Sequence, residues 1–312
     1  MKISVITPTY NRSSWLKATV DSIMSQEVKD QVEYIVVDNN SSDDTKEVIH
    51  ECIKKYHGAP IILKYLYEGK PGINNARNTG IAQSDGDYVI FFDDDIVLEK
   101  GGLQAYIDAF KQFPQQLVFG GKIKLLRPDF SLPAWLATSG PYLRPMIVYD
   151  LDYGNANSVI QGFESMPIGL SMAIKRTAFE KYGVFRTDLG LTKKKLMPGA
   201  EYELFLRFSK EINGWVYVAD GLVYHPIKKE QACKSYFRKR LFGVGRVTYR
   251  LHPFEAKKRI FGLPLYILGF IVKHGMLALK YAVSAKPMES FFHETEMFTY
   301  MGCVREHFAQ KK

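Results

Sequence analysis

Apolar and polar positions alternate between two periods over the first 125 residues. Short apolar runs of strand character are separated by longer segments in which apolar residues recur every three or four positions. The strand-like runs are Ile3–Thr7, Glu33–Val37, Ile61–Leu66, Tyr88–Phe92 and Leu117–Ile123. This exchange predicts an α/β fold of right-handed βαβ units, with a mostly parallel sheet flanked by helices and ligands bound beyond the carboxyl ends of the strands.

Two helices are predicted between the first three strands. Ser13 or Ser14 is placed to cap the first helix, and Ser42 is placed to cap the second. The inward faces are expected to carry Leu16, Val20, Ile23 and Met24 in the first helix, and Val48, Ile49, Cys52, Ile53 and Tyr56 in the second.

The periodic pattern is interrupted in the middle of the chain. From Arg127 to about Gly162 the sequence is rich in Pro, Gly, Asn and Tyr, and we expect a substrate-facing insertion there. A regular pattern resumes at Met166–Ile174. A loop, a helix and a strand are then predicted at Lys193–Lys195, at about Gly199–Ser209 and at Trp215–Ala219.

Composition places the chain among globular proteins, and its positive charge is local. With 46% apolar and 24% charged residues, disorder, collagen and small disulfide scaffolds are excluded. The net charge is +9, but the segment Lys228–Lys286 holds fourteen basic and two acidic residues, which leaves a net charge of −3 for all other residues. This concentration argues against a diffuse nucleic-acid-binding surface, so no nucleic-acid partner is expected.

The same basic segment contains the most apolar run of the chain. Ile260–Val272 is thirteen residues long, which is too short to span a bilayer. Continuing to Val283 would give the length but would put Lys273 and His274 near the bilayer centre. We therefore expect residues 227–312 to form a helical, membrane-associated region that lies on an anionic membrane surface, after a catalytic domain at 1–226. The alternative is a buried helix with solvated basic flanks.

The cysteines and the amino-terminal residues indicate a reducing, cytoplasmic compartment. The three cysteines are widely spaced and odd in number, and Cys52 lies on an apolar helical stripe, so a core thiol in a reducing environment is predicted. Pro8, Asn11 and Arg12 leave no apolar stretch of signal-peptide length near the amino terminus. The expected location is cytoplasmic, peripheral on the inner face of the plasma membrane.

The residues that follow the first two strands indicate which kind of ligand the protein binds. A dinucleotide-binding protein would have a Gly-rich turn where this chain has Thr7-Pro8-Thr9-Tyr10-Asn11-Arg12, which argues against nicotinamide or flavin chemistry. Asp38 ends the second strand, where a carboxylate can accept hydrogen bonds from a ribose or a base imide. A turn or capping role is the alternative for Asp38.

Three carboxylates, Asp93, Asp94 and Asp95, follow the apolar strand Tyr88–Phe92. They would repel one another unless a cation holds them, and in extended chain Asp93 and Asp95 point the same way. All-oxygen ligands select Mg²⁺ or Mn²⁺, which leave other coordination positions to phosphates and water. The triplet therefore predicts a divalent-metal site, with a solvated acidic turn as the alternative.

Three further positions are candidates, each with a structural alternative. Arg77, on a short predicted helix, can place its guanidinium against a base or phosphate, or form a surface ion pair. Glu201 and Glu203 lie in the first turn of the late helix, where acidic residues also complement the helix dipole, and sequence alone does not rank them. His225 is a candidate metal or phosphate ligand or a structural histidine.

Together these segments resemble family 2 of the glycosyltransferases, which are inverting, nucleotide-sugar-dependent enzymes of the GT-A fold. The resemblance runs from Ile3 to about His225, with a looser tail to about Arg250. It rests on segments in the family's order: Val5–Arg12, Val36-Val37-Asp38, Ala76–Gly80, Asp93–Asp95, Gly169 with Lys175-Arg176, Gly199–Arg207 and Tyr224-His225.

The resemblance implies roles for individual residues. The expected nucleotide-binding residues are Pro8, Tyr10, Arg12, Asp38, Arg77, Asp93 and Asp94. The expected metal site comprises Asp93, Asp95 as the direct ligand, and His225 in support of metal or diphosphate, with Mn²⁺ or Mg²⁺ as cofactor. Glu201 takes the place of the catalytic base, although the family usually has Glu-Asp where this chain has Ala200-Glu201.

The function implied is transfer of a sugar from a nucleotide-diphosphate donor, most commonly a UDP-sugar, to a glycan or lipid-linked acceptor in cell-surface or exopolysaccharide synthesis. Two alternatives stay open. The changed Ala200-Glu201 pair is compatible with a catalytically inactive membrane-surface scaffold, and strand-end carboxylates also occur in metal-dependent nucleotidyltransferases.

Overall fold

The computed structural model describes residues 1–126, 128–143, 150–162, 166–191, 196–209, 211–212, 214–252 and 254–310. The predicted lysine loop at 193–195 and parts of the predicted insertion lie outside these ranges. The chain forms two compact units. The sheet unit comprises Met1–Leu126, Asp150–Asp188 and Ala200–Pro226, and the helical unit comprises Arg127–Tyr149, Leu189–Gly199 and Ile227–Lys312. The predicted division at residue 226 does not anticipate the two earlier segments of the helical unit.

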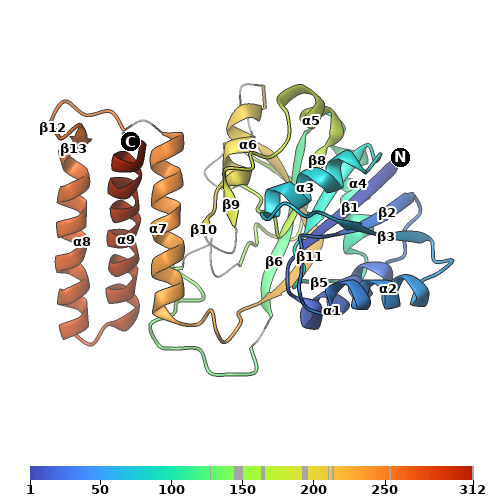
Figure 1. The fold of residues 1–312 in the computed structure, drawn as a ribbon, viewed down its shortest axis with the longest axis horizontal. Coiled ribbons are helices and arrows are strands. Elements are labelled where there is room, and N and C mark those ends of the chain that lie inside the picture. Colours follow the sequence, from blue (N-terminus) through green and yellow to red (C-terminus); the bar gives the residue numbers. More distant parts are fainter. Residues whose placement is uncertain are drawn as a thin grey trace. The chain divides into compact units, whose positions relative to one another are not determined.

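Among the described residues, nine strands of the sheet unit form one sheet in the order β3-β2-β1-β4-β8-β6-β11-β5, with β7 on β11 (Figure 1). Their bounds are β1 Lys2–Thr9, β2 Gln31–Asp38, β3 Ile61–Tyr67, β4 Tyr88–Phe92, β5 Val97–Leu98, β6 Val118–Leu126, β7 Ser158–Ile160, β8 Ser171–Lys175 and β11 Trp215–Pro226. The neighbours β3, β2, β1 and β4 run parallel, as do β6 and β11, whereas β8 is antiparallel to β4 and β6. The predicted α/β class with a mostly parallel sheet is confirmed.

The helices of the sheet unit follow the predicted pattern with different starts. They are α1 Ser13–Met24, α2 Thr45–Lys55, α3 Ile73–Ala82, α4 Gly102–Gln112, α5 Arg176–Tyr182 and α6 Ala200–Phe208. The predicted serine caps are wrong, because α1 follows Arg12 at its cap position and α2 follows Asp44. Instead, Asp43 accepts hydrogen bonds from the amides of both Ser13 and Thr45, so one carboxylate serves the first residue of each helix.

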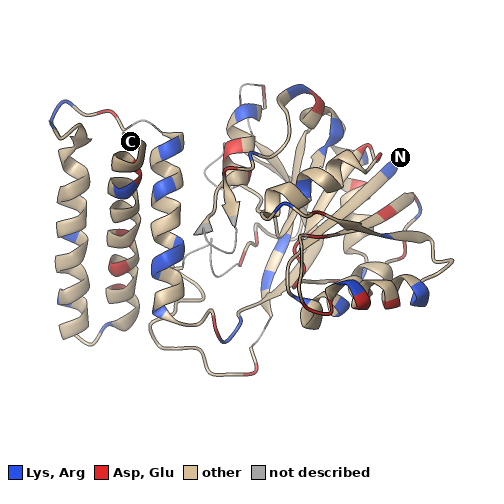
Figure 2. Ribbon diagram, in the orientation of Figure 1, with Lys and Arg blue, Asp and Glu red and all other residues tan. Residues whose placement is uncertain are grey.

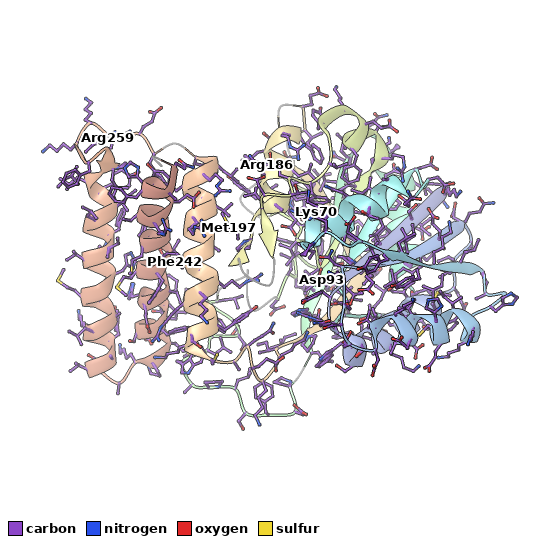
Figure 3. All side chains as sticks on the ribbon, viewed as in Figure 1. Lys70, Asp93, Arg186, Met197, Phe242 and Arg259 are labelled. Carbon is purple, nitrogen blue, oxygen red and sulfur yellow. The ribbon has the colours of Figure 1, made fainter. Side chains whose placement is uncertain are left out.

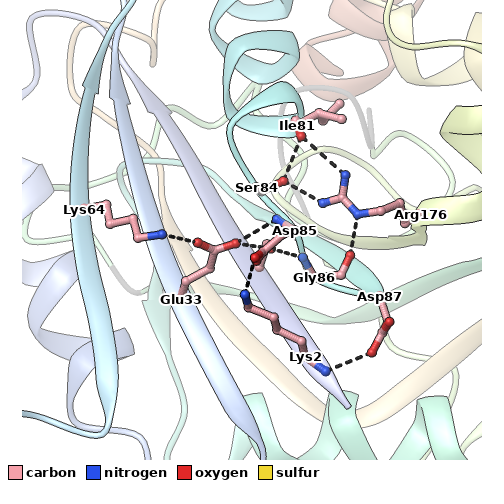
Figure 4. A network of polar contacts seen from close by, with 10 residues as sticks. Lys2, Glu33, Lys64, Ile81, Ser84, Asp85, Gly86, Asp87 and Arg176 are labelled. Carbon is pink, nitrogen blue, oxygen red and sulfur yellow. Dashed lines mark hydrogen bonds and ion pairs between the residues drawn. The ribbon is translucent and has the colours of Figure 1, made fainter.

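A polar network fixes the amino-terminal ends of the central strands (Figure 4). Buried Glu33 accepts hydrogen bonds from Ser4 at 2.6 Å and from Lys64 at 2.6 Å. Nearby, Arg176 donates to the carbonyl of Gly86 at 2.5 Å and to the hydroxyl of Ser84 at 2.7 Å. A buried carboxylate with such partners stabilises the sheet at this end, and the candidate residues gather at the opposite end.

In the helical unit, α7 Lys234–Leu251 and α8 Leu265–Val283 both pack against α9 Pro287–Gln310 (Figure 1). Short strands β9 Gly190–Leu191, β10 Leu196–Met197, β12 Arg259–Ile260 and β13 Leu263–Pro264 complete the unit. The predicted apolar run, Ile260–Val272, begins in the β12–β13 hairpin and not in a helix. Helix α8 therefore starts later than the run, at Leu265, and continues beyond it to Val283. By length and composition, α8 is the one helix in the described ranges that could cross a membrane.

Candidate active site

Parallel pairing brings the predicted nucleotide and metal residues to one edge of the sheet. Thr9 of β1 is in register with Asp38 of β2, which is in register with Tyr67 of β3. Strand β4 lies on the other side of β1 and ends at Phe92, so the aspartate triplet begins at the same edge, where Figure 3 labels Asp93. Carboxyl ends of parallel strands are the usual ligand site of such sheets.

The three aspartates have different partners. The hydroxyl of Thr9 donates to Asp94 at 2.7 Å, and the guanidinium of Arg12 pairs with both Asp94 and Asp95. Asp94 and Asp95 are buried, whereas Asp93 is about one-third exposed. The exposed position at the edge makes Asp93 the member of the triplet with most access to an incoming ligand.

Arg77 connects the triplet to the late helix. It projects from α3, and its side chain is only 3% exposed. Its Nη1 donates to Glu201 Oε1 at 2.8 Å, its Nη2 lies 3.9 Å from Asp93 Oδ1, and the guanidinium lies over the ring of Phe185. Within the described part of the chain its Nε has no hydrogen-bond partner. This bridge between Asp93 and Glu201 joins segments more than 100 residues apart and was not predicted from the sequence.

Gly169 permits the close approach of Arg77 and Glu201. A Cβ atom at this position would overlap with Arg77 Nη2 and would lie 2.6 Å from Glu201 Oε1. Any side chain would therefore displace the guanidinium or the carboxylate. The family resemblance singled out Gly169. The close contacts there give a steric reason for a glycine at this position.

The two glutamates of α6 point to different environments. Glu201 faces Arg77, but Glu203 is buried and pairs with Arg207 at 3.0 Å on the same helix. Arg207 also donates to the carbonyls of Tyr182 and Val184. Glu203 thus belongs to a structural network around α5, and Glu201 is the acidic residue of α6 that reaches the strand-end cluster.

His225 reaches the cluster from β11, which is separated from β4 by β8 and β6 in the sheet. Strand β11 extends to Pro226, beyond the predicted end at Ala219, so His225 lies within a strand and not after one. Its Nε2 is 3.5 Å from Asp95 Oδ1. The register of β11 against β6 shifts between Val218 and Val223, and the strand resumes pairing beyond this irregularity.

The electrostatics of the cluster favour an added cation. Burial raises the pKa of Asp94 to about 6, with Arg12 opposing and Asp95 adding to the rise. Desolvation by the surrounding protein also raises the pKa of the partly exposed Asp93, where Arg77 opposes the rise and the charges of Asp95 and Glu201 add to it. Desolvation is the largest cause of both rises, so a cation bound beside these carboxyls would favour their ionised form.

A divalent cation fits the residues at this point. Carboxylate oxygens of Asp93 and Asp95 and the imidazole nitrogen of His225 are ligands that suit Mn²⁺ or Mg²⁺. Across the described ranges, no three His, Cys, Asp or Glu side chains already converge as a metal site, and Arg12 supplies positive charge at Asp95. The donor chemistry therefore fits, and the metal assignment stays a prediction.

The predicted base- and ribose-binding residues occupy the β1 and β2 ends. Pro8 is buried in β1, and Tyr10 is half-buried just beyond it. Asp38 accepts hydrogen bonds from the Tyr65 hydroxyl at 3.0 Å and from the Ser41 amide at 2.9 Å, so its carboxylate is held in one orientation. Tyr65 was not among the predicted residues, although parallel pairing puts it in register with Val36, close to Asp38.

An α/β sheet of this topology with carboxylates, an arginine and a histidine at the strand ends defines the GT-A class of sugar transferases. Residues 4–183 match the model of glycosyl transferase family 2. The chain belongs to this family and is a glycosyltransferase.

Similar proteins include the enzyme named poly(ribitol-phosphate) beta-N-acetylglucosaminyltransferase TarP of Staphylococcus aureus, 26% identical over 82% of this chain and 81% of that protein. The enzyme named GalNAc(5)-diNAcBac-PP-undecaprenol beta-1,3-glucosyltransferase of Campylobacter jejuni is 43% identical, but the match covers 33% of this chain and 32% of that enzyme. The chain thus spans about a third of the length of the Campylobacter enzyme.

Solved structures show the same fold. The mannosyltransferase PcManGT of Pyrobaculum calidifontis, in complex with GDP-Man and Mn²⁺, has a TM-score of 0.63 and 16% identity over 99% of this chain and 88% of that chain. A Staphylococcus aureus TarS fragment in complex with UDP-GlcNAc has a TM-score of 0.53 and 16% identity over 100% of this chain and 93% of that chain. At this identity the similarity supports the GT-A fold and not a substrate.

Proposed function

We propose that the protein transfers a sugar from a nucleotide-diphosphate donor to a glycan or lipid-linked acceptor, with inversion at the anomeric carbon. The observation that carries this proposal is the buried Arg77, which joins Asp93 of the strand-end cluster to Glu201 of α6. It brings the candidate base next to the carboxylates at which the donor phosphates and a cation would lie. A scaffold without catalysis would not require this alignment.

Glu201 acts as the general base in the proposed reaction. It accepts a proton from an acceptor hydroxyl while that oxygen attacks the anomeric carbon, the bond to the donor phosphate breaks, and the electron pair leaves with the nucleoside diphosphate. Inversion follows because there is one displacement. Arg77 holds the Glu201 carboxylate in place through the 2.8 Å hydrogen bond, which reduces the freedom that its longer side chain would otherwise have.

Asp95, with Asp93 and His225, would hold the divalent ion, which when bound stabilises negative charge on the leaving diphosphate. The Mn²⁺ in the complex of the fold neighbour PcManGT supports this choice of cofactor. Arg12 lies against Asp94 and Asp95 and provides a second positive charge on the same side. Asp38, Pro8 and Tyr10 are proposed to position the base and ribose.

The names of similar proteins support the finer assignments. TarP is named for transfer of N-acetylglucosamine to poly(ribitol-phosphate), and the Campylobacter enzyme is named for glucosyl transfer to an undecaprenol-linked glycan. We infer a role in cell-surface glycan synthesis, with a UDP-sugar as the first donor to test because TarS was solved with UDP-GlcNAc. We propose a location on the inner face of the plasma membrane, because an acceptor on a lipid carrier would be presented there.

A screen of nucleotide-sugars tests the proposal. The full chain is incubated with UDP-, GDP- and dTDP-sugars in the presence of MnCl₂, and release of nucleoside diphosphate is measured for wild type and Asp95→Ala. We expect release from one donor class by the wild type and a loss of several orders of magnitude in the variant. Release that is equal in both proteins, or that a chelator leaves unchanged, contradicts the metal-assisted mechanism.

A further inference from the structure

One face of α8 is apolar and exposed. Val272, Met276, Leu279 and Val283 follow one another at spacings of three and four residues, and their exposed fractions are 59%, 63%, 67% and 81%. The opposite face packs against α9, with Ile267 fully buried. Four large apolar side chains at this spacing form a continuous stripe, here called the α8 stripe.

The β12–β13 hairpin presents a further apolar side chain at the start of α8. Phe261 forms its turn and is 78% exposed, with a positive φ of 48° that is unfavourable for an aromatic residue. The turn is held by Arg259, which donates to the carbonyls of Gly262 and Phe254, and by His307, whose Nε2 is 3.0 Å from the Phe261 carbonyl. The fold thus holds an aromatic ring outward at a fixed position.

All Lys, Arg, Asp and Glu residues in the segment around these apolar groups are basic. From Ala256 to Met288 the sequence contains six basic residues and no Asp or Glu. Figure 2 shows the nearly uncharged α8 on one side of α9 and the strongly basic α7 on the other. All six are exposed: Lys257, Lys258, Arg259, Lys273, Lys280 and Lys286. Exposed apolar side chains within a purely basic segment are complementary to a bilayer with anionic headgroups.

We propose that the α8 stripe and Phe261 dock the protein on an anionic lipid bilayer, with α8 lying in the plane of the interface. This deepens the proposed function in one respect, because a lipid-linked acceptor would be presented at that surface. A second copy of the chain is the less suitable partner, since two such faces would bring twelve like charges together.

The contacts of α8 with α9 favour a helix in the interface over one that spans. Ser290 of α9 donates to the carbonyl of Ala278 at 2.8 Å, and the Nδ1 atoms of His274 and His293 lie 3.1 Å apart. If α8 crossed the bilayer with these contacts intact, α9 would carry Glu294 and Glu296 into the hydrocarbon region. Ionised side chains are costly there, whereas an interfacial helix leaves α9 in water.

Vesicle co-sedimentation of the full chain tests the docking. Phosphatidylcholine vesicles with and without phosphatidylglycerol are compared for wild type, Met276→Glu/Leu279→Glu, Lys257→Glu/Lys258→Glu and Phe261→Ala. The matched control is Ile62→Glu, which replaces a 60% exposed apolar residue of β3 in the sheet unit. Thermal melting is recorded for each protein, because all of these side chains are exposed and their replacement should leave the fold intact.

We expect the wild type to pellet with anionic vesicles and only weakly with neutral ones. Met276→Glu/Leu279→Glu should lower the partition coefficient by at least about tenfold, and the lysine reversals by roughly fivefold for each charge removed. Phe261→Ala should give a smaller loss, and Ile62→Glu should bind like the wild type. Salt should weaken the binding without abolishing it, because the apolar contribution is not screened.

Three results would overturn the proposal: equal sedimentation of wild type and the α8 variants, self-association without lipid that Met276→Glu/Leu279→Glu abolishes, or membrane binding that resists alkaline extraction as a spanning helix does. The binding assay contains neither donor nor acceptor. Release of nucleoside diphosphate is measured separately on the same proteins, so failure of the docking and failure of the proposed transfer reaction are distinguishable.

Discussion

At the residue scale, the proposed chemistry depends on how a few charged side chains are aligned by their neighbours. Arg77 is almost fully buried, and it contacts Glu201 directly and approaches Asp93. Gly169 leaves just enough room for this arrangement. The carboxylate of Glu201, the proposed base, is therefore positioned by Arg77 of α3 and by the space at Gly169.

Replacing Gly169 by alanine tests this steric requirement. The new methyl group would collide with the Arg77 guanidinium, so Glu201 should lose its orientation. We expect kcat for nucleoside diphosphate release or sugar transfer to fall by at least about 10²-fold, because small misplacements of a catalytic group cost that much. Gly69→Ala is the control for a general effect of the substitution, because a Cβ atom there would make only an ordinary 3.5 Å contact with Tyr67 in the same unit. Equal activity of Gly169→Ala and wild type would contradict the assigned contact.

The two glutamates of α6 should differ in kind. Glu201→Gln removes a base while keeping shape, so transfer should fall by about 10²–10⁴-fold with donor affinity retained. Glu203→Gln should chiefly lower the melting temperature, because it weakens the pair with Arg207. Steady-state kinetics, donor binding and melting curves of both variants distinguish these effects. Greater catalytic damage in Glu203→Gln would mean that the wrong glutamate is assigned.

The sequence identifies some of these residues and not others. Three carboxylates directly after an apolar strand form a local sequence pattern, so Asp93–Asp95 could be identified from the sequence. The residue pattern by itself could not separate Glu201 from Glu203, because the choice depends on how α6 is rotated about its axis, and only the family resemblance pointed to Glu201. That rotation is fixed by contacts of Arg207 with carbonyls of Tyr182 and Val184, which are distant in sequence.

At the element scale, an ion-pair cluster between α7 and α9 is the clearest tertiary interaction among the described residues of the helical unit. Glu306 of α9 is 1% exposed and accepts hydrogen bonds from Arg246 and Arg250 of α7, each at 2.9 Å. The helices approach closely at Gly245 and Gly302, where a Cβ atom would meet backbone of the opposite helix. The cluster therefore fixes the register of two helices that pack with little space between them.

The pH dependence of stability should reveal this cluster. Burial by itself raises the pKa of Glu306, but the hydrogen bonds from Arg250 and Arg246 outweigh it and lower that pKa below the ordinary value. The stabilisation is thus present at neutral pH and is lost as pH falls below about 4.

Glu306→Gln should lower the free energy of unfolding by about 2 kcal/mol at neutral pH, because two partly buried arginines lose their charged hydrogen-bond partner. The difference from wild type should shrink on acidification. Denaturant melts at neutral pH and at about pH 3 measure it, with the exposed Glu255→Gln as control. A difference that does not change with pH would show that Glu306 contributes through packing and not through its charge.

Strand β11 shows why one element was predicted too short. The pair Asp220-Gly221 is typical of a turn, so the pattern predicted an end at Ala219. In the structure the register shifts there as an irregularity within one strand, and pairing with β6 continues to Pro226. Pairing with a neighbouring strand overrides the local preference, and this continuation carries His225 to the site.

At the scale of the whole molecule, the sheet unit could be foreseen and the full extent of the helical unit could not. Alternating periods predicted the sheet because each βαβ unit is local in sequence. The helical unit takes in Trp135, whose ring lies 5.5 Å from that of Phe237 and 4.5 Å from that of Phe291. Such contacts join segments more than 100 residues apart and leave no periodic signal.

Metal binding should stabilise the whole chain. A ligand that binds only the folded state adds about 2.7 kcal/mol of stability at a concentration 100 times its Kd. We therefore expect MnCl₂ to raise the melting temperature of the wild type by several degrees and to leave that of Asp95→Ala unchanged. Calcium chloride at the same concentration controls for ionic strength and divalent charge, and an equal increment in both proteins would place the metal elsewhere.

The anomeric configuration of the first product tests the central claim most directly. With an α-linked donor identified in the screen, ¹H NMR is recorded during turnover, either with an acceptor or with water as the slow acceptor. A single displacement assisted by Glu201 predicts that the β anomer forms first, before mutarotation, and that Glu201→Gln suppresses its formation. An α anomer as the first product would contradict the mechanism built on the Arg77–Glu201 arrangement.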